Sequence, residues 1–197
     1  CFESASEFPD IKFSVIIPTF NNQNHLRVVV DHLYAQDVGL DAFEIIVVDD
    51  GSTDQTQRLL LQSIDRWDRP LNFKYIYFPR KTQRVMGDAQ YRAGIARNLG
   101  AKNAVGDILA FLDSDIVVGT DYLSQVEEGL KHWDALQAKR INLSQNASHL
   151  KFKYSQLSRE TELIADEPYW EEFIKTKNWH QMPYNWKYVC THSFSLR

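Results

Sequence analysis

The feature that most constrains this chain is the apolar run Ile108-Leu-Ala-Phe-Leu112, which ends abruptly in Asp113-Ser-Asp115. A short apolar run bounded by turn residues is typical of a buried strand, so both acids are expected at its carboxyl end. Side chains alternate along an extended chain, which would aim the two carboxylates to the same side. Their repulsion, roughly 4 kcal/mol at an effective dielectric constant of about 20, would be relieved by a divalent cation. The alternative is that the two acids merely end a strand and cap the next helix.

Four other strands are predicted along the chain. Residues 12–19 form an apolar run stopped by Pro18, and residues 43–50 form a second run that ends in Asp49 and Asp50. A strand over 72–78 is followed by an exposed basic loop over 79–84. Residues 1–10 are expected to be a loose lead-in, and residues 188–195 alternate enough to form one more strand.

Helices are predicted between these strands. Apolar residues recur at helical spacing from Asn24 onward, and Ser52 with Gln55 has the spacing of a capping box. A helix with small residues is expected from about Gly87 to Val105, and another after Gly119 that carries an apolar stripe up to Trp133. Strands and helices that alternate in this way predict an α/β fold, with a mostly parallel, Rossmann-like sheet flanked by helices.

Polar residues gather where the predicted strands end. In parallel sheets, ligands bind beyond the carboxyl ends of the strands. The residues expected at that edge are Thr19, Asp49, Asp50, Asp113 and Asp115.

Composition narrows the class of protein. A length of 197 residues with 44% hydrophobic residues suits one domain with a full core. The net charge of −4 gives no sign of nucleic-acid binding, and no apolar run approaches the roughly 18 residues of a membrane span. Cys1 and Cys190 are too few for a disulfide framework, which favours a reducing compartment. We therefore expect a cytoplasmic protein, with the inner face of a membrane as the alternative.

Four segments, at residues 13–21, 45–54, 96–100 and 106–115, resemble in order and spacing the motifs of the inverting family 2 glycosyltransferases of the GT-A fold. The resemblance implies a single GT-A-like domain over 1–197, truncated at its C-terminal side. Residues 12–118 would be the nucleotide-sugar-binding half, and 119–197 would begin the acceptor-binding half. The implied activity is divalent-metal-dependent transfer of a sugar, with inversion, from a nucleotide-diphosphate donor, most simply a UDP-sugar. The acceptor would be a glycan or a lipid-linked molecule, as in polysaccharide biosynthesis, and further segments would allow peripheral membrane association.

The resemblance also assigns nucleotide-binding residues. The turn Pro18-Thr19-Phe20 would hold the base and ribose, and Asp50 would accept a hydrogen bond from the uracil ring nitrogen. Asp49 would either help to bind the nucleotide or stabilise the turn that follows the strand over 43–50. Arg92 resembles an arginine that approaches the nucleotide, whereas Arg97 lies on a different helix face and is expected to be structural.

Metal ligands and a catalytic base complete the implied site. Asp113 would touch ribose or metal, with Ser114 beside it at the nucleotide, and Asp115 would ligate Mn²⁺ or Mg²⁺ directly. His192 is a candidate further ligand, although a lone histidine is more often structural. The base is expected beyond Arg197, and the internal candidates Asp166 and Glu167 are also explained as solvated acids at a helix start.

Other functions remain open at this point. A nucleotide-sugar-binding module without turnover would carry the same motifs. A nucleotidyltransferase would be expected to have a phosphate loop rich in glycine and basic residues after the first strand, and residues 18–22 contain neither Gly nor Lys. A phosphoacceptor receiver domain would carry paired acids on its first strand, whereas here they begin on the second.

Overall fold

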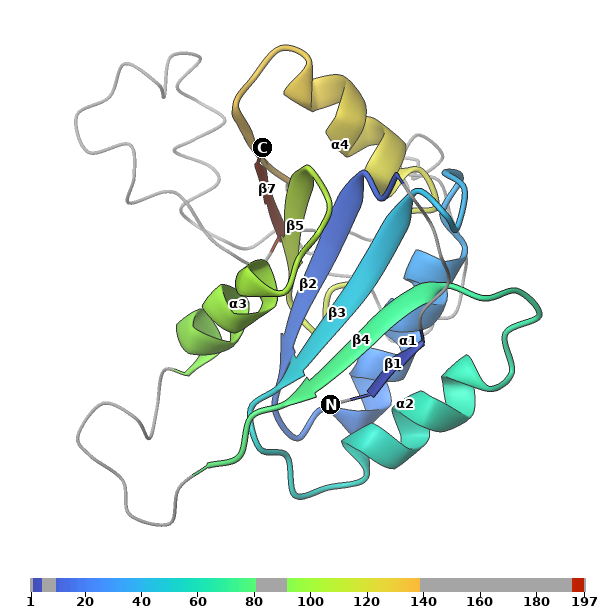
Figure 1. Ribbon diagram of the computed structural model, residues 1–197, viewed down its shortest axis with the longest axis vertical. Helices are drawn as coiled ribbons and strands as arrows, with labels where there is room; N and C mark the ends of the chain where they lie inside the picture. The colour runs from blue at the N-terminus through green and yellow to red at the C-terminus, as the bar shows by residue number, and fades with distance from the viewer. Residues whose placement is uncertain (1, 5–9, 81–91, 139–192, 197) are drawn as a thin grey trace, which may run out of the picture.

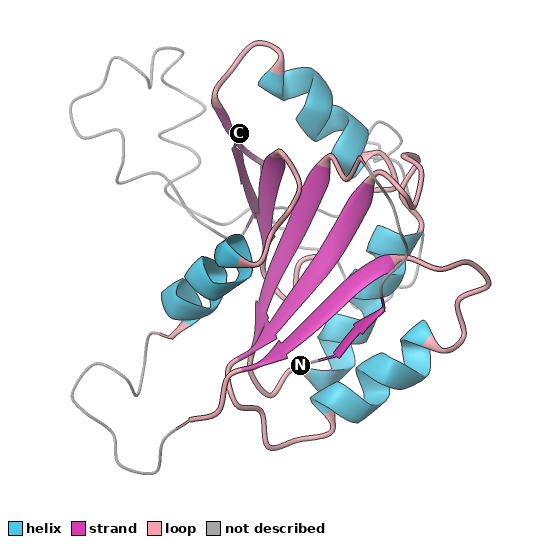
Figure 2. Cartoon of the chain, in the orientation of Figure 1, coloured by secondary structure: helices cyan, strands magenta, loops and turns pink. Residues whose placement is uncertain are grey.

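The structure, a computed structural model, describes residues 2–4, 10–80, 92–138 and 193–196. Within these residues one sheet has the strand order β1-β4-β3-β2-β5-β7-β6, with helices on both of its faces (Figures 1 and 2). The strands are β1 (Phe2–Ser4), β2 (Phe13–Thr19), β3 (Phe43–Asp49), β4 (Asn72–Tyr77), β5 (Ile108–Leu112), β6 (Ala135–Gln137) and β7 (Ser193–Leu196). The helices are α1 (Gln23–Tyr34), α2 (Thr56–Ile64), α3 (Ala93–Lys102) and α4 (Tyr122–Leu130).

The centre of the sheet is parallel, as predicted. Strands β4, β3, β2 and β5 all run in one direction, while β1, at the edge beside β4, and β7, which lies between β5 and β6, are antiparallel to their neighbours. In the pairing register Thr19 lies opposite Asp49, and Asp49 lies opposite Tyr77. The carboxyl ends of β2, β3 and β4 are therefore level, and the loops that follow them share one edge.

Alternating residues of the central strands form two cores. Phe13, Val15 and Ile17 of β2 are fully buried on the face that carries α1, α2 and α4. Ile16 points to the opposite face, where it packs with Ala96 of α3. Because both faces of the sheet are covered, its central strands are continuous apolar runs.

Helix α3 lies close against the sheet because its inner face carries small residues. A Cβ atom added to Gly100 would lie 2.4 Å from Ile16 Cγ2. Below this helix, buried Glu44 accepts hydrogen bonds from Ser14 Oγ at 2.6 Å and from the Val105 backbone N–H at 2.8 Å. Lys74 pairs with the same carboxylate at 2.9 Å, so the end of α3 is tied to three strands remote from the carboxyl edge.

Several element predictions needed correction. Residues 2–4 form β1 on β4 instead of belonging to a loose lead-in, because the free edge of β4 offers backbone partners. The predicted capping box is wrong, because Asp54 rather than Ser52 receives the Thr56 backbone N–H, at 3.0 Å, and α2 starts only at Thr56. Strand β6 was missed because three residues carry too little periodicity.

Two predicted boundaries differ as well. Helix α3 ends at Lys102, and of its predicted start only residues from 92 onward are described. Trp133 lies beyond α4 and is 63% exposed, so it does not continue the apolar stripe. Strand β7 extends to Leu196, and the earlier part of its predicted range, 188–192, lies outside the described residues. In the part of the chain that is described, no helix is both long and apolar enough to cross a membrane.

Candidate functional site

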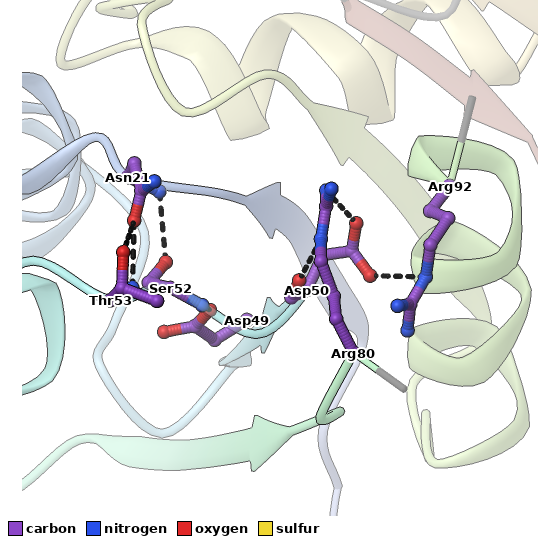
Figure 3. A network of polar contacts seen from close by, with 7 residues as sticks. All are labelled: Asn21, Asp49, Asp50, Ser52, Thr53, Arg80 and Arg92. Carbon is purple, nitrogen blue, oxygen red and sulfur yellow. Dashed lines mark hydrogen bonds and ion pairs between the residues drawn. The ribbon is translucent and has the colours of Figure 1, made fainter. Parts of the chain in front are cut away.

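The candidate site lies at the carboxyl edge of the parallel strands, where the loops after β2, β3, β4 and β5 meet. Figure 3 shows the part of this edge formed by the loops after β2, β3 and β4, together with Arg92 at the start of α3. Within the described residues, the predicted site residues Pro18, Thr19, Phe20, Asp49, Asp50, Arg92, Asp113, Ser114 and Asp115 all lie at or next to this edge.

Asp50 is a buried carboxylate held between two arginines. Arg80 Nη2 lies 2.6 Å from Asp50 Oδ2, and Arg80 Nε donates to the Asp50 backbone oxygen at 2.8 Å. From the other side, Arg92 Nε lies 2.7 Å from Asp50 Oδ1, as Figure 3 shows. The Arg92 N–H is not aligned with that oxygen, so Oδ1 receives no hydrogen bond from any described residue. Asp50 is thus a buried, charge-neutralised carboxylate, with Oδ1 against Arg92 and Oδ2 bonded to Arg80.

Aromatic rings support both arginines. The Arg80 guanidinium carbon lies 3.6 Å from the centre of the Phe20 ring, and that of Arg92 lies 4.4 Å from the Phe78 ring. These are the distances of cation–π contacts. Phe20 keeps 42% of its surface exposed, so the site contains a flat apolar platform beside a buried carboxylate.

Asp49 has a structural role. Its Oδ1 accepts the Ser52 backbone N–H at 2.7 Å, which closes the turn after β3, and its Oδ2 accepts the hydroxyl of Tyr75. Burial, together with the hydrogen bond to Asp49 and the negative charge of that carboxylate, raises the pKa of Tyr75 well above its ordinary value near 10. Of the two expected roles for Asp49, the geometry favours stabilisation of the turn after β3.

Asn21 joins the loops after β2 and β3. It has a positive φ of 49°, a backbone conformation that asparagine tolerates better than most residues. Its side-chain oxygen accepts the Thr53 backbone N–H at 2.8 Å, and its own backbone N–H donates to Ser52 Oγ at 2.9 Å (Figure 3). These bonds fix the turn that presents Phe20.

The acids after β5 lie in a turn. The Ile116 N–H donates to the Asp113 backbone oxygen at 3.1 Å, so the extended alternation that we expected to align Asp113 with Asp115 stops at Leu112. Asp113 is partly buried and pairs with Arg97 at 2.5 Å, whereas Asp115 is exposed. Asn22 Nδ2 donates to Ser114 Oγ at 2.9 Å and links this turn to the loop after β2.

The remaining predicted residues divide into two groups. Thr19 is buried, and its hydroxyl has no hydrogen-bond partner among the described residues, which leaves a polar group available at the strand end. Pro18 lies within β2, opposite Val48. His192, Asp166 and Glu167 lie outside the described residues.

Three contributors were missed or misplaced by the sequence analysis. Arg80 was assigned to an exposed loop, but its side chain is only 20% exposed and contacts Asp50. Arg97 reaches Asp113 from α3, so it belongs to the same edge as Arg92. Asn21 was assigned only to a turn. An asparagine after a strand is a weak signal, but a basic residue soon after the strand that follows Asp49 and Asp50 in the chain could have identified Arg80.

Comparison with known proteins identifies relatives with a related fold. Validoxylamine A glucosyltransferase of Streptomyces hygroscopicus is 37% identical over 113 residues, which are 57% of this chain and 24% of that protein. Poly(ribitol-phosphate) beta-N-acetylglucosaminyltransferase TarS of Staphylococcus aureus is 34% identical over 113 residues, 57% of this chain and 18% of that protein. The crystal structure of S. aureus TarS 1–349 in complex with UDP matches with a TM-score of 0.52 and 27% identity, over 68% of this chain and 39% of that one.

These matches show a GT-A glycosyltransferase fold, in agreement with the architecture expected from the sequence. The chain spans about a quarter or less of the two curated relatives. The model of the family described as glycosyl transferase family 2 matches residues 14–197, nearly the whole chain. This chain therefore belongs to glycosyl transferase family 2.

Proposed function

We propose that this protein transfers a sugar with inversion from a UDP-sugar to a glycan or lipid-linked acceptor, with a divalent metal ion at Asp113 and Asp115. Family membership supports sugar transfer in general, and TarS, a relative, has been crystallised with UDP and with UDP-GlcNAc. The observation that carries the proposal is Asp50, a buried carboxylate whose partner Arg80 also lies over the partly exposed ring of Phe20.

The base would bind at Asp50. A uracil ring presents an N–H flanked by two carbonyl groups, and a carboxylate acceptor favours that donor over the unprotonated N1 of adenine. The ring would stack on Phe20, and Thr19 would offer the nucleoside its hydroxyl, which has no hydrogen-bond partner among the described residues. Strands β3 and β5 lie on either side of β2, so the base and diphosphate sites are two strand spacings, about 10 Å, apart. That separation is close to the length of a nucleoside monophosphate.

The residues after β5 fit a hard divalent cation. Among the described residues, no group of three or more His, Cys, Asp or Glu side chains is placed to hold a metal, so these residues alone do not form a complete cage. Mg²⁺ and Mn²⁺ commonly bind through one or two carboxylates plus substrate phosphates and water. Asp115 is exposed and would be the direct ligand, while Asp113 would contribute by loosening its pair with Arg97. When bound, the cation would neutralise the charge that develops on the leaving diphosphate.

The chain's own residues would orient the donor and support the charge of the leaving group. Asp50 and Phe20 would fix the base, and the loop held by Asn21 and Asn22 would keep the base and phosphate sites in register. Arg97, once released from Asp113, would lie next to the diphosphate. Inversion requires a base that deprotonates the acceptor hydroxyl, and we retain Asp166, Glu167 and residues beyond Arg197 as candidates for that role.

Two further assignments remain proposals. Residues 12–118 would bind the donor. Residues from 119 onward would begin the acceptor side, because α4 and β6 follow the acidic turn in the chain and extend away from the shared edge. A cytoplasmic or membrane-face location would suit a lipid-linked acceptor.

Calorimetric titration of UDP, GDP and ADP with and without Mn²⁺ tests the donor site. We expect UDP to bind tightest, with an affinity that rises at least tenfold on addition of Mn²⁺. The variant Asp115→Asn should lose that rise, whereas Asp107→Asn, at the opposite end of β5, should keep it. Equal affinity for the three nucleotides, or no effect of Mn²⁺, would contradict the proposed site.

The second candidate function, a donor-binding module without turnover, shares this binding behaviour. UDP release from UDP-glucose and UDP-GlcNAc in the presence of candidate acceptors separates the two functions. Acceptor-dependent release would establish transfer, while donor binding with no release under any acceptor would favour the module.

A further inference from the structure

Arg80 has the same two partners that the proposed base would need. Its guanidinium lies over Phe20 at 3.6 Å, and its Nη2 lies 2.6 Å from Asp50 Oδ2. A guanidinium is a flat group that stacks on an aromatic face and donates N–H bonds from its edge. A pyrimidine ring with a protonated ring nitrogen has the same two properties. Both groups therefore compete for one platform and one carboxylate.

We propose that Arg80 occupies the base site in the donor-free protein, and that a pyrimidine nucleoside binds only after Arg80 leaves Phe20 and Asp50. This inference rests on the proposed function, because it concerns the same pocket. It adds a residue that limits donor affinity from within the site.

The position of Arg80 is built into the fold. The Phe78 backbone N–H donates to the Asp49 backbone oxygen at 2.7 Å, which extends the β3–β4 pairing to the end of β4. Gly51, with a φ of 80°, then passes directly against Arg80. A Cβ atom at Gly51 would lie 2.9 Å from both the backbone nitrogen and Cγ of Arg80. The missing side chain at Gly51 is therefore what lets Arg80 reach over Phe20.

If Arg80 leaves, Asp50 still has Arg92 as a partner. Arg92 is buried and stays 2.7 Å from Oδ1, so the carboxylate remains paired while Oδ2 becomes free for the base. A ligand that binds only the open form has an affinity reduced by the fraction of molecules in that form. If about one molecule in ten is open, removal of Arg80 tightens binding roughly tenfold.

Uridine is the appropriate probe, because it carries the base without phosphate charge. The loss of a positive side chain would weaken UDP binding for simple electrostatic reasons and would mask the effect. We expect R80A and R80Q to bind uridine roughly tenfold more tightly than the wild type by calorimetry. R80Q keeps part of the packing stem in case R80A folds poorly. R58A, which removes an exposed arginine on α2, should leave uridine affinity unchanged.

A second measurement tests occupancy of the pocket directly. Ethylguanidinium at millimolar concentration should compete with uridine in R80A, because the vacated position matches a guanidinium. It should have little effect in the wild type, where Arg80 already fills that position. Unchanged or weaker uridine binding in both variants, with the wild type still binding UDP, would overturn the role of Arg80 alone. Absence of UDP binding in the wild type would instead overturn the proposed function.

Discussion

Asp49 and Asp50 are adjacent, yet they face opposite sides of the sheet. Asp49 bonds Tyr75, whose ring belongs to the core under α1 and α2, while Asp50 meets Arg92 at the start of α3 on the other face. This division follows from the alternation of side chains along a strand. The sequence predicted that both acids end β3, but which one serves the site depended on partners from β4 and α3.

The Tyr75–Asp49 contact predicts a specific response to alkaline pH. The pKa of Tyr75 is raised in the folded protein, so this group stays protonated there after it ionises in the unfolded chain. Its contribution to stability is complete below about pH 10 and is lost as pH rises further, by roughly 1 kcal/mol between about pH 10 and 11. Urea unfolding of the wild type should show this loss.

Tyr75→Phe isolates that contribution. At about pH 8 we expect the variant to be less stable by about 1–3 kcal/mol, because Asp49 Oδ2 loses its buried donor. Between about pH 8 and 11 its free energy of unfolding should fall less than that of the wild type. Parallel pH curves for the two proteins would contradict the raised pKa.

Asn21 combines a special backbone conformation with a side-chain acceptor, and substitutions separate the two. Asn21→Gly keeps the positive φ accessible but removes the acceptor for Thr53, so we expect a loss of about 1 kcal/mol. Asn21→Ala should lose about 1 kcal/mol more through backbone strain. Asn21→Asp keeps the acceptor and serves as the control. Urea unfolding of the three variants checks this order, and equal losses for Ala and Gly would argue against the strain component.

At the scale of elements, long and strongly periodic segments were predictable, and short ones were not. Helix α1 and strands β2, β3 and β5 carry enough apolar residues to reveal their period. Strands β1 and β6 have three residues each and exist because a neighbouring strand offers an unpaired edge. The contacts of Arg80 and Arg97 could not be predicted from the sequence either, because they depend on how the loop after β4 and helix α3 are placed at the sheet edge.

Helix α3 offers a matched pair of glycines for testing its packing. Gly100→Ala places a methyl group 2.4 Å from Ile16 Cγ2, so we expect a destabilisation of about 1–3 kcal/mol despite the better helix propensity of alanine. A Cβ atom at Gly94, in the same helix, would meet no atom of the described residues within 4 Å outside its chain neighbours and the helix's own backbone, so Gly94→Ala should stabilise by up to about 1 kcal/mol. Chemical denaturation of both variants measures these changes. Similar effects at the two positions would mean that α3 does not lie close to the sheet.

At the scale of the whole molecule, opposite ends of the parallel strands have separate roles. The amino-terminal side carries the buried Glu44 network that ties α3 to the sheet, and the carboxyl edge carries the candidate site. Paired acids at a strand end predicted the location of the site from sequence. The sequence did not predict that Asp50 would be paired with two arginines and Asp113 with one. Those arginines are 30 and 42 residues from Asp50 and 16 residues from Asp113 along the chain.

The proposed site couples the binding of two ligands, UDP and Mn²⁺, to folding. A ligand that binds only the folded state stabilises it by about 2.7 kcal/mol at a hundred times its dissociation constant. UDP with Mn²⁺ should therefore raise the free energy of unfolding by about that amount, while either ligand alone, at the same concentration, should raise it much less. Asp115→Asn should abolish the extra gain from Mn²⁺, and Asp107→Asn should retain it. Chemical unfolding monitored by circular dichroism measures the free energy of unfolding of each protein with UDP, with Mn²⁺ and with both. An equal gain from UDP in the presence of EDTA would mean that the carboxylates after β5 bind no metal with the nucleotide, and the diphosphate would then have to be stabilised by Arg97 and other cationic groups instead.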